Sequence, residues 1–320
     1  MKYEKPALTF EQLADKLLGR GLIAERGELI AKLKVTSYFR LSAYFYPFRD
    51  GDDALKPGTT LAAVQRLYDF DQRLRTAVLD AIESIEVHIR TQLSHHFAHV
   101  HGPFAYLNSV NFPNFDKDKG DFDRWERNLR EQMDRGRLPK GKEDFVLHFF
   151  RKYGDSEDLL PIWMLAELMD FGSTLPFFRG VEHRIRKALA SNLGQPEEVV
   201  FSWLLSLNAI RNRCAHHARL WNWSIGYPVL IPAPRKNPDW HVVRIANDRL
   251  GIILTICCYW LKRIGLKPEW ASAIISLIDE YPEVFPADLG MPGDWRRHPV
   301  WLDVVGGGEQ KEIDPAKRLE

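Results

Sequence analysis

The chain has 320 residues, of which 45% are hydrophobic and 27% are charged, a balance that excludes a disordered protein. Its formal net charge of +1 excludes a surface that is basic overall, so a nucleic acid would have to bind a local patch. Three cysteines without a CxxC pair exclude a disulfide framework and a zinc knuckle.

Short helices are expected in the N-terminal part of the chain. Thr9, followed three residues later by Gln12, is typical of a capping box and predicts a helix over residues 9–19. A second helix is expected over residues 25–34. We treat residues 1–58 as an N-terminal helical lobe, because a Pro-Gly break follows.

The strongest helical pattern extends from Thr60 to about His101, where apolar residues recur every three or four positions without glycine or proline. These apolar residues are Val64, Leu67, Leu74, Val78, Ile82, Ile85 and Ile89. A helix of about 40 residues would extend over roughly 60 Å. We expect a kink in a helix of this length.

The remaining pattern is also helical, which predicts an all-α fold without strands. Further helices are expected over residues 121–135, 145–153, 161–170, 182–193, 197–216, 243–263 and 269–281. Residues 171–173 are expected to form a turn. We assign residues 59–286 to one helical domain with a loop-rich insertion at 102–160, and residues 287–320 to a peripheral tail.

The chain shows no targeting or membrane segment by sequence. It begins without the apolar stretch of a signal peptide, and no uncharged segment reaches the roughly 18 residues of a membrane span. We therefore expect a cytoplasmic protein with no membrane partner, in keeping with its few cysteines.

The most informative segment is the helix expected over residues 197–216, which ends in the sequence RNRCAH. Its apolar residues recur every three or four positions and predict a buried stripe. They are Val200, Trp203, Leu207, Ile210 and Cys214. On a wheel of about 100° per residue, Arg211 and His216 lie about 140° apart, too far to face one small ligand on a straight helix. Either the helix loosens at its end, or a second copy of the chain completes the site.

The polar residues at this helix end suit the cleavage of RNA by its own 2′-hydroxyl. A histidine can accept or donate the proton near neutral pH. A guanidinium such as that of Arg211 can hold two phosphate oxygens and stabilise the extra charge of the transition state. The amide of Asn212 can position either partner. This chemistry requires no metal and rejects DNA, which lacks the 2′-hydroxyl.

At these residues the chain resembles the Abi-like abortive-infection family, a branch of the HEPN superfamily of helical ribonucleases. The superfamily signature is Arg, a polar residue, a short spacer and His, as in residues 211–216. Matching segments in the expected order are 38–44 (YFRLSAY), 82–87 (IESIEV) with Arg90, 161–163 (PIW), 171–172 (FG), 202–212 (SWLLSLNAIRN) and 217–222 (HARLWN).

The resemblance implies a HEPN-like helical bundle that acts as a metal-independent endoribonuclease in phage defence or as the toxin of a toxin–antitoxin module. It also implies a homodimer, in which two motifs face each other across a two-fold axis. A small RNA or a protein antitoxin is an implied inhibitor, and no cofactor is implied.

The match to the motif implies a role for each polar residue. Arg211 would bind phosphate, His216 would transfer the proton and Asn212 would orient them. His217 is an alternative to His216, because the superfamily also tolerates a spacer of five residues. Possible supporting residues are Asn208, Glu86 and Arg90, and weaker candidates for RNA binding are Arg40, Arg213 and Arg219.

Two other functions stay open at this point. The same residues would serve a non-catalytic module that binds RNA or a nucleotide, and the helical pattern alone would serve a structural interaction protein. His95 and His99 have the i, i+4 spacing of zinc ligands, but no cysteine or HExxH glutamate accompanies them, so we expect no metal site.

Overall fold

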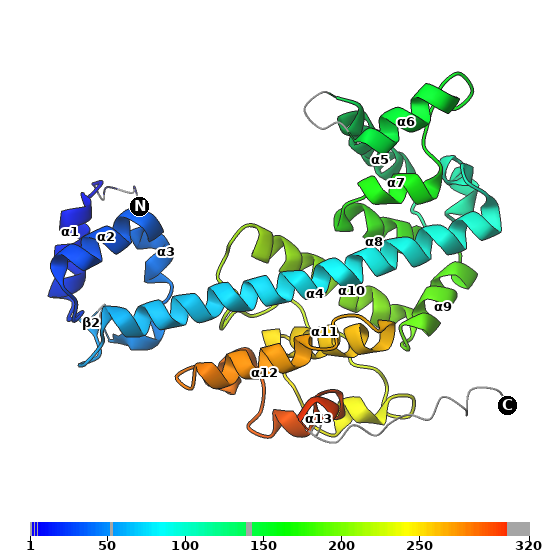
Figure 1. Ribbon diagram of the computed structural model, residues 1–320. Coiled ribbons are helices and arrows are strands. Elements are labelled where there is room, and N and C mark those ends of the chain that lie inside the picture. The colour runs from blue at the N-terminus through cyan, green and yellow to red at the C-terminus, as the bar shows by residue number, and fades with distance from the viewer. Residues whose placement is uncertain (1, 3, 5, 52–53, 139–142, 306–320) are drawn as a thin grey trace.

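The fold is organised around one long helix, α4 (Leu61–His101), which crosses the molecule from end to end (Figure 1). The computed structural model that gives this arrangement describes residues 2, 4, 6–51, 54–138 and 143–305. Thr60 caps the start of α4 by accepting a hydrogen bond from the Ala63 N–H, and Gly102 ends the helix with a positive φ of 96°. The predicted all-α fold with a long central helix is therefore confirmed.

The kink that we expected in α4 is absent. All 41 residues are helical, and Figure 1 shows a gentle curve. Kinks arise where proline, paired small residues or an inserted group interrupt the hydrogen bonds, and α4 contains neither glycine nor proline. Length alone was a poor reason to expect a kink, because other helices pack against α4 along its length.

The N-terminal helices cover one end of α4 (Figure 1). They are α1 (Phe10–Gly19), α2 (Arg26–Thr36) and α3 (Tyr38–Ser42). The capping box is confirmed, since Thr9 and Gln12 exchange hydrogen bonds of 2.9 and 3.2 Å. The expectation of no strands was wrong here, because β1 (Arg49–Asp50) pairs with β2 (Ala54–Leu55) in antiparallel register. Strands of two residues are too short to produce an alternating pattern.

A second group of helices projects away from the other end of α4 (Figure 1). It comprises α5 (Asp121–Arg137), α6 (Asp144–Tyr153), α7 (Ile162–Leu168) and α8 (Phe171–Gly180). The turn expected at 171–173 is instead the start of α8. The Asp170 carboxylate caps this helix by accepting from the Ser173 N–H at 2.7 Å, and Phe171, Phe177 and Phe178 are buried. Burial of these rings outweighs the unfavourable Pro176 within the helix.

The remaining helices pack along α4. They are α9 (His183–Asn192), α10 (Glu197–Ala215), α11 (Leu250–Ile264) and α12 (Trp270–Glu280), while α13 (Pro299–Val305) packs on α11 and α12 instead. Short 3-10 helices are η1 (Tyr46–Phe48), η2 (Ala105–Leu107), η3 (Ser109–Asn111), η4 (Pro238–His241), η5 (Pro286–Leu289) and η6 (Trp295–Arg297). Among the described residues, no helix combines the length and apolar character of a membrane span.

Two expectations for the C-terminal third need correction. The helix expected from residue 243 begins at Leu250, because the preceding backbone is extended: Asp248 O and Asn247 O accept from the N–H groups of Ile225 and Val229. The segment expected to be a peripheral tail is packed against the core over residues 287–302. Trp301 is completely buried and its Nε1 donates to the Thr255 hydroxyl on α11 at 3.1 Å. Residues 306–320 of that tail lie outside the described part of the chain.

Candidate functional site

Helix α10 runs in the opposite direction to α4. Arg211 approaches Glu86, while Leu220 and Trp221, farther along the chain, contact Asp71, which lies earlier on α4. The predicted buried stripe that holds α10 in place is confirmed, with every member at most 3% exposed. It consists of Val200, Trp203, Leu207, Ile210 and Cys214. The polar residues of α10 are therefore left on its other faces.

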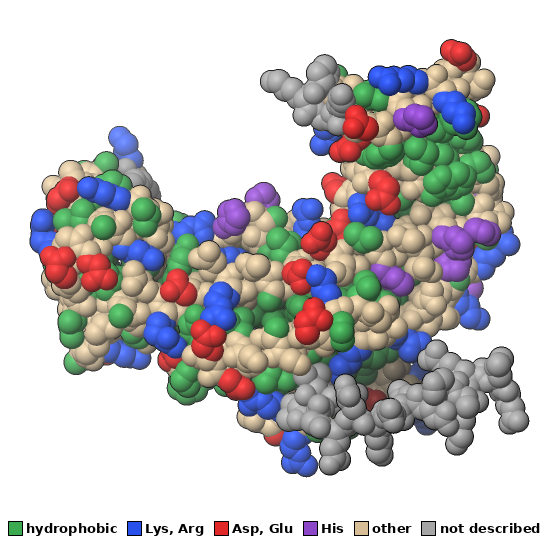
Figure 2. All heavy atoms as spheres, viewed as in Figure 1, with side chains coloured by type: hydrophobic (Ala, Val, Ile, Leu, Met, Phe, Trp, Pro, Cys, Tyr) green, Lys and Arg blue, Asp and Glu red, His purple; other side chains and the backbone are tan. Residues whose placement is uncertain are grey.

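The polar motif ends on a turn, residues 216–221, which we call the motif turn. It begins exposed at His216 and ends buried at Leu220 and Trp221. His216 closes α10 as its C-cap, and His217 adopts a left-handed conformation with φ of 55°. Both histidines are exposed. The end of α10 emerges between the N-terminal helices and the α5–α8 group (Figure 1), and Figure 2 shows a hollow at this place with histidine side chains on its floor.

Arg211 lies beside Glu86 of α4. Its Nε is 3.9 Å from Glu86 Oε2, and its Nη1 donates to Asn212 Oδ1 at 3.5 Å. Burial raises the pKa of Glu86, and the charges of Arg90 and Arg211 only partly offset this effect. Arg211 itself is 37% exposed, so its guanidinium remains accessible to an anion.

The other supporting candidates on these two helices are less directly involved. Arg90 is close enough to influence the Glu86 carboxyl, but its Nη1 donates to Met169 O, at the C-terminal end of α7, at 2.5 Å. A cation is favourable at this position because the last carbonyl groups of a helix carry partial negative charge. Asn208 is half-buried, one turn before Asn212 on α10.

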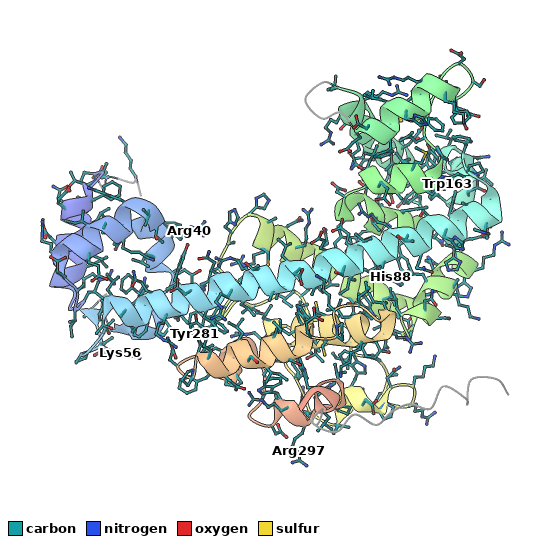
Figure 3. All side chains as sticks on the ribbon, viewed as in Figure 1. Arg40, Lys56, His88, Trp163, Tyr281 and Arg297 are labelled. Atoms are coloured by element: carbon teal, nitrogen blue, oxygen red, sulfur yellow. The ribbon has the colours of Figure 1, made fainter. Side chains whose placement is uncertain are left out.

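The three arginines predicted as weak RNA contacts all donate hydrogen bonds to backbone carbonyl groups at or near the motif turn. Arg40 donates to His217 O at 2.6 Å, and Arg219 donates to Ala43 O at 2.8 Å. Arg213 donates to Arg219 O at 2.6 Å, and its guanidinium lies 4.3 Å from the centre of the Trp223 ring. Arg40 extends from α3 towards the end of α10 (Figure 3). These arginines therefore have a structural role whether or not they bind RNA.

A residue that we did not predict, Asp71, fixes the motif turn to α4. It is completely buried, and its Oδ1 accepts from the N–H groups of Leu220 and Trp221 at 2.9 and 2.5 Å. Its Oδ2 accepts from the Tyr44 hydroxyl at 2.5 Å and from Arg75. Burial and the Asp71 charge raise the pKa of Tyr44, so this hydroxyl stays protonated and continues to donate.

The sequence contained a signal for Asp71. It falls beside the apolar residues Phe70 and Leu74 on the face of α4 that the periodicity assigns to the core, and Arg75 follows four residues later. A carboxylate at a core position of a helix must be paired there, since an isolated buried charge is too costly. Its partners on the motif turn, however, are backbone groups that no side-chain pattern identifies.

The separation of Arg211 from His216 is not relieved within one chain. The His216 N–H donates to Asn212 O at 3.0 Å, so the backbone is helical through Ala215, and His216 itself is the C-cap. The helix therefore does not loosen between Arg211 and Ala215, which argues against the first of the two explanations offered by the helical wheel. This geometry is compatible with the second explanation, in which another copy of the chain completes the site.

The histidines near the end of α4 are arranged differently from a metal site. The rings of His95 and His99 lie 4.0 Å apart, and His99 Nδ1 lies 2.9 Å from His95 O. Within the described part of the chain, no three His, Cys, Asp or Glu side chains are grouped so that they could hold a metal ion.

Comparison with known protein families gives a match over the candidate site. The family model described as Abi-like protein matches residues 31–222, more than half of the chain. The matched segment extends from α2 past the motif turn and includes Arg211, Asn212, His216 and His217. No match was found among curated proteins or among solved structures.

Proposed function

The chain belongs to the Abi-like protein family, and we propose on this premise that it is a metal-independent endoribonuclease. We propose further that it acts in phage defence by abortive infection, or as the toxin of a toxin–antitoxin module, and that it belongs to the HEPN superfamily. The observation that carries the proposal is the exposed start of the motif turn, which presents His216 and His217 shortly after Arg211 and Asn212, at the end of a helix held by a buried stripe.

In the proposed reaction, the 2′-oxygen of a ribose attacks the adjacent phosphorus. One imidazole, assigned to His216, accepts the 2′ proton, while the guanidinium of Arg211 holds the phosphate oxygens and stabilises the charge of the pentavalent transition state. The new P–O2′ bond forms as the P–O5′ bond breaks, and a second imidazole, for which the neighbouring His217 is the candidate, gives a proton to the departing 5′-oxygen. The products are a 2′,3′-cyclic phosphate and a 5′-hydroxyl.

We assign the complete site to a homodimer. The reaction needs an Arg211 and a His216 around one phosphate, yet the two residues leave the helix about 140° apart. In a two-fold dimer the same surface of each chain faces its copy, so Arg211 of one chain would oppose His216 of the other. An active ribonuclease of this kind would harm its own cell, and we propose a small RNA or a protein antitoxin as its restraint.

The chemistry of the cleaved ends tests the proposal. Purified protein incubated with single-stranded RNA in EDTA should produce 2′,3′-cyclic phosphate ends. His216→Ala should lower the rate by about 10²–10⁴-fold, the usual contribution of a general acid–base group. Removal of an exposed histidine on α6, in His148→Ala, is the matched control and should leave the rate unchanged.

Three outcomes would contradict this function. Products with 3′-hydroxyl ends would exclude attack by the 2′-hydroxyl, and loss of cleavage in EDTA would indicate a metal. RNA binding without cleavage, weakened by Arg211→Ala, would identify a non-catalytic RNA-binding module instead.

Mixing two inactive variants tests whether the site is shared. In a mixed dimer of Arg211→Ala and His216→Ala chains, one of the two proposed sites combines an intact Arg211 with an intact His216. Activity should therefore return when the two purified variants are mixed and allowed to exchange subunits. No recovery in dimers shown to have exchanged would place both residues of a site in one chain.

A further inference from the structure

A cavity of about 540 Å³ lies directly beside the motif turn. It is bounded by the N-terminal helices on one side, by α4 on another and by the end of α10 on the third. Residues that line it include Thr36, Arg40, Tyr68, Gln72, Thr76 and His217. Its volume falls within the range of about 300–1,000 Å³ that is usual for small-molecule sites. We call it the lobe groove, since the N-terminal lobe supplies one wall.

The charge of the lobe groove favours an anion. The Arg40 guanidinium lines it, and none of the lining residues is an aspartate or a glutamate. Arg75 also lines it, but its charge is paired with the buried Asp71 carboxylate. The chain as a whole carries 44 basic and 43 acidic residues, so an acid-free surface of this size is a local departure from the average. It meets the requirement that a nucleic acid bind a local patch on a neutral protein.

The side chains of the lobe groove also suit a base. The Tyr68 ring is half-buried and is held edge-on by Tyr44, with ring centres 5.1 Å apart and an angle of 71° between the planes. The Lys32 ammonium lies over the ring, 5.3 Å from its centre, so a base that stacks on this face displaces that flexible side chain. One turn farther along α4, the Gln72 side chain is exposed. An aromatic ring provides a stacking surface for any base, and an amide can donate to or accept from a base edge.

The lobe groove reaches the end of α10 at His217, the residue that follows His216. Cys214, Ala215 and His217 form part of its wall. Arg40, on the wall that the N-terminal lobe supplies, donates a hydrogen bond to His217 O. A strand of RNA whose phosphate lies at the end of α10 would therefore have its next nucleotide beside this groove.

We propose that the lobe groove is a base-binding subsite for single-stranded RNA, and that it takes the nucleotide next to the cleaved linkage. The base stacks on Tyr68, its edge contacts the Gln72 amide, and its phosphate lies near Arg40 and His217. This inference rests on the proposed ribonuclease function and adds the part of the substrate that the N-terminal lobe recognises. Gln72 then sets the base preference at one position of the cleavage site.

Binding of a non-cleavable RNA tests the subsite. The probe is a short single-stranded oligonucleotide with a 2′-deoxyribose at the cleavage position, titrated into the full chain. Tyr68→Leu should weaken binding by about 5–150-fold, which corresponds to the loss of about 1–3 kcal/mol of base stacking. Gln72→Ala changes an exposed side chain, so its effect cannot be attributed to misfolding. It should relax the base preference in the cleavage pattern of a mixed-sequence RNA.

A glutamine outside the groove provides the matched control. Gln65 lies two turns before Gln72 on the same helix and does not line the groove, so Gln65→Ala should change neither affinity nor preference. If the wild-type protein cleaves RNA while Tyr68→Leu and Gln72→Ala match it in affinity and base preference, the subsite is wrong and the ribonuclease function stands. If the wild-type protein neither binds nor cleaves RNA, both proposals fail.

Discussion

The two sides of the motif turn use their polar groups in opposite ways. On the side that faces α4, Asp71 is completely buried, and each of its carboxylate oxygens accepts two hydrogen bonds. On the outward side, His216 and His217 are exposed. Arg211, which precedes the turn on α10, is partly exposed, and its contacts with Glu86 and Asn212 are long, at 3.9 and 3.5 Å. The comparison separates polar groups that fold the chain from polar groups that remain available to a ligand.

Removal of the buried carboxylate should produce the largest effect on stability. Asp71→Ala leaves Arg75 buried without its partner and frees two backbone N–H groups of the motif turn. We expect a loss of about 3–5 kcal/mol in the free energy of unfolding, the usual result of breaking one side of a buried ion pair. Denaturant unfolding measures it, with exposed Asp69 as the control in Asp69→Ala. A loss below about 1 kcal/mol would show that Asp71 does not hold the turn.

Arg213→Ala should have an intermediate effect on stability. It removes the hydrogen bond to Arg219 O and the contact with the Trp223 ring, together worth about 1–3 kcal/mol. The exposed Arg235, changed to alanine, is the control for loss of a positive charge. If Arg213→Ala instead weakens RNA binding and leaves the melting temperature unchanged, Arg213 is one of the polar groups that bind a ligand and does not stabilise the fold.

His217→Gly should stabilise the protein slightly. The left-handed conformation at φ of 55° is costly for histidine and is freely adopted by glycine, and the exposed imidazole loses little packing. We expect a gain of about 0.5–1 kcal/mol, reduced by the greater freedom of glycine in the unfolded chain. His216→Gly is the matched control. With a φ of −85°, His216 has no such strain to relieve, and the substitution should destabilise. Equal signs for the two variants would contradict this account.

Glu86→Gln should have the smallest effect, and one that depends on pH. The pKa of Glu86 is raised in the folded protein, so folding favours its protonated form over its charged form, relative to the unfolded chain. The stability that it contributes is complete below its ordinary pKa of 4.5 and is lost as the pH rises through the folded-state value. The glutamine variant should therefore be more stable than the wild type at pH 7, by less than about 1 kcal/mol, and equal to it near pH 4.

Melting temperatures across this pH range measure the difference. The exposed Glu83 on the same helix, changed to glutamine, controls for the loss of charge alone. A variant that is less stable at pH 7 would show that the ion pair with Arg211 outweighs the cost of burying the carboxylate.

Local periodicity was enough to predict the parts of the molecule that depend on one buried face. It gave α4, the stripe of α10 and the placement of the motif at an exposed helix end. It failed where tertiary contacts override local preference. Residues 171–173 suggested a turn, yet burial of phenylalanines forms α8. Residues 247–248 were expected to be helical, but their carbonyl groups accept from the N–H groups of Ile225 and Val229. Asp71 was missed because half of its partners are backbone groups distant in sequence.

The most direct test of the central claim compares folding and catalysis in one variant. His216 is exposed, so His216→Ala should keep the melting temperature of the wild type while the rate of RNA cleavage per folded molecule falls by at least about 100-fold. Cleavage at the wild-type rate by this folded variant would contradict the assignment of the outward side of the motif turn to catalysis.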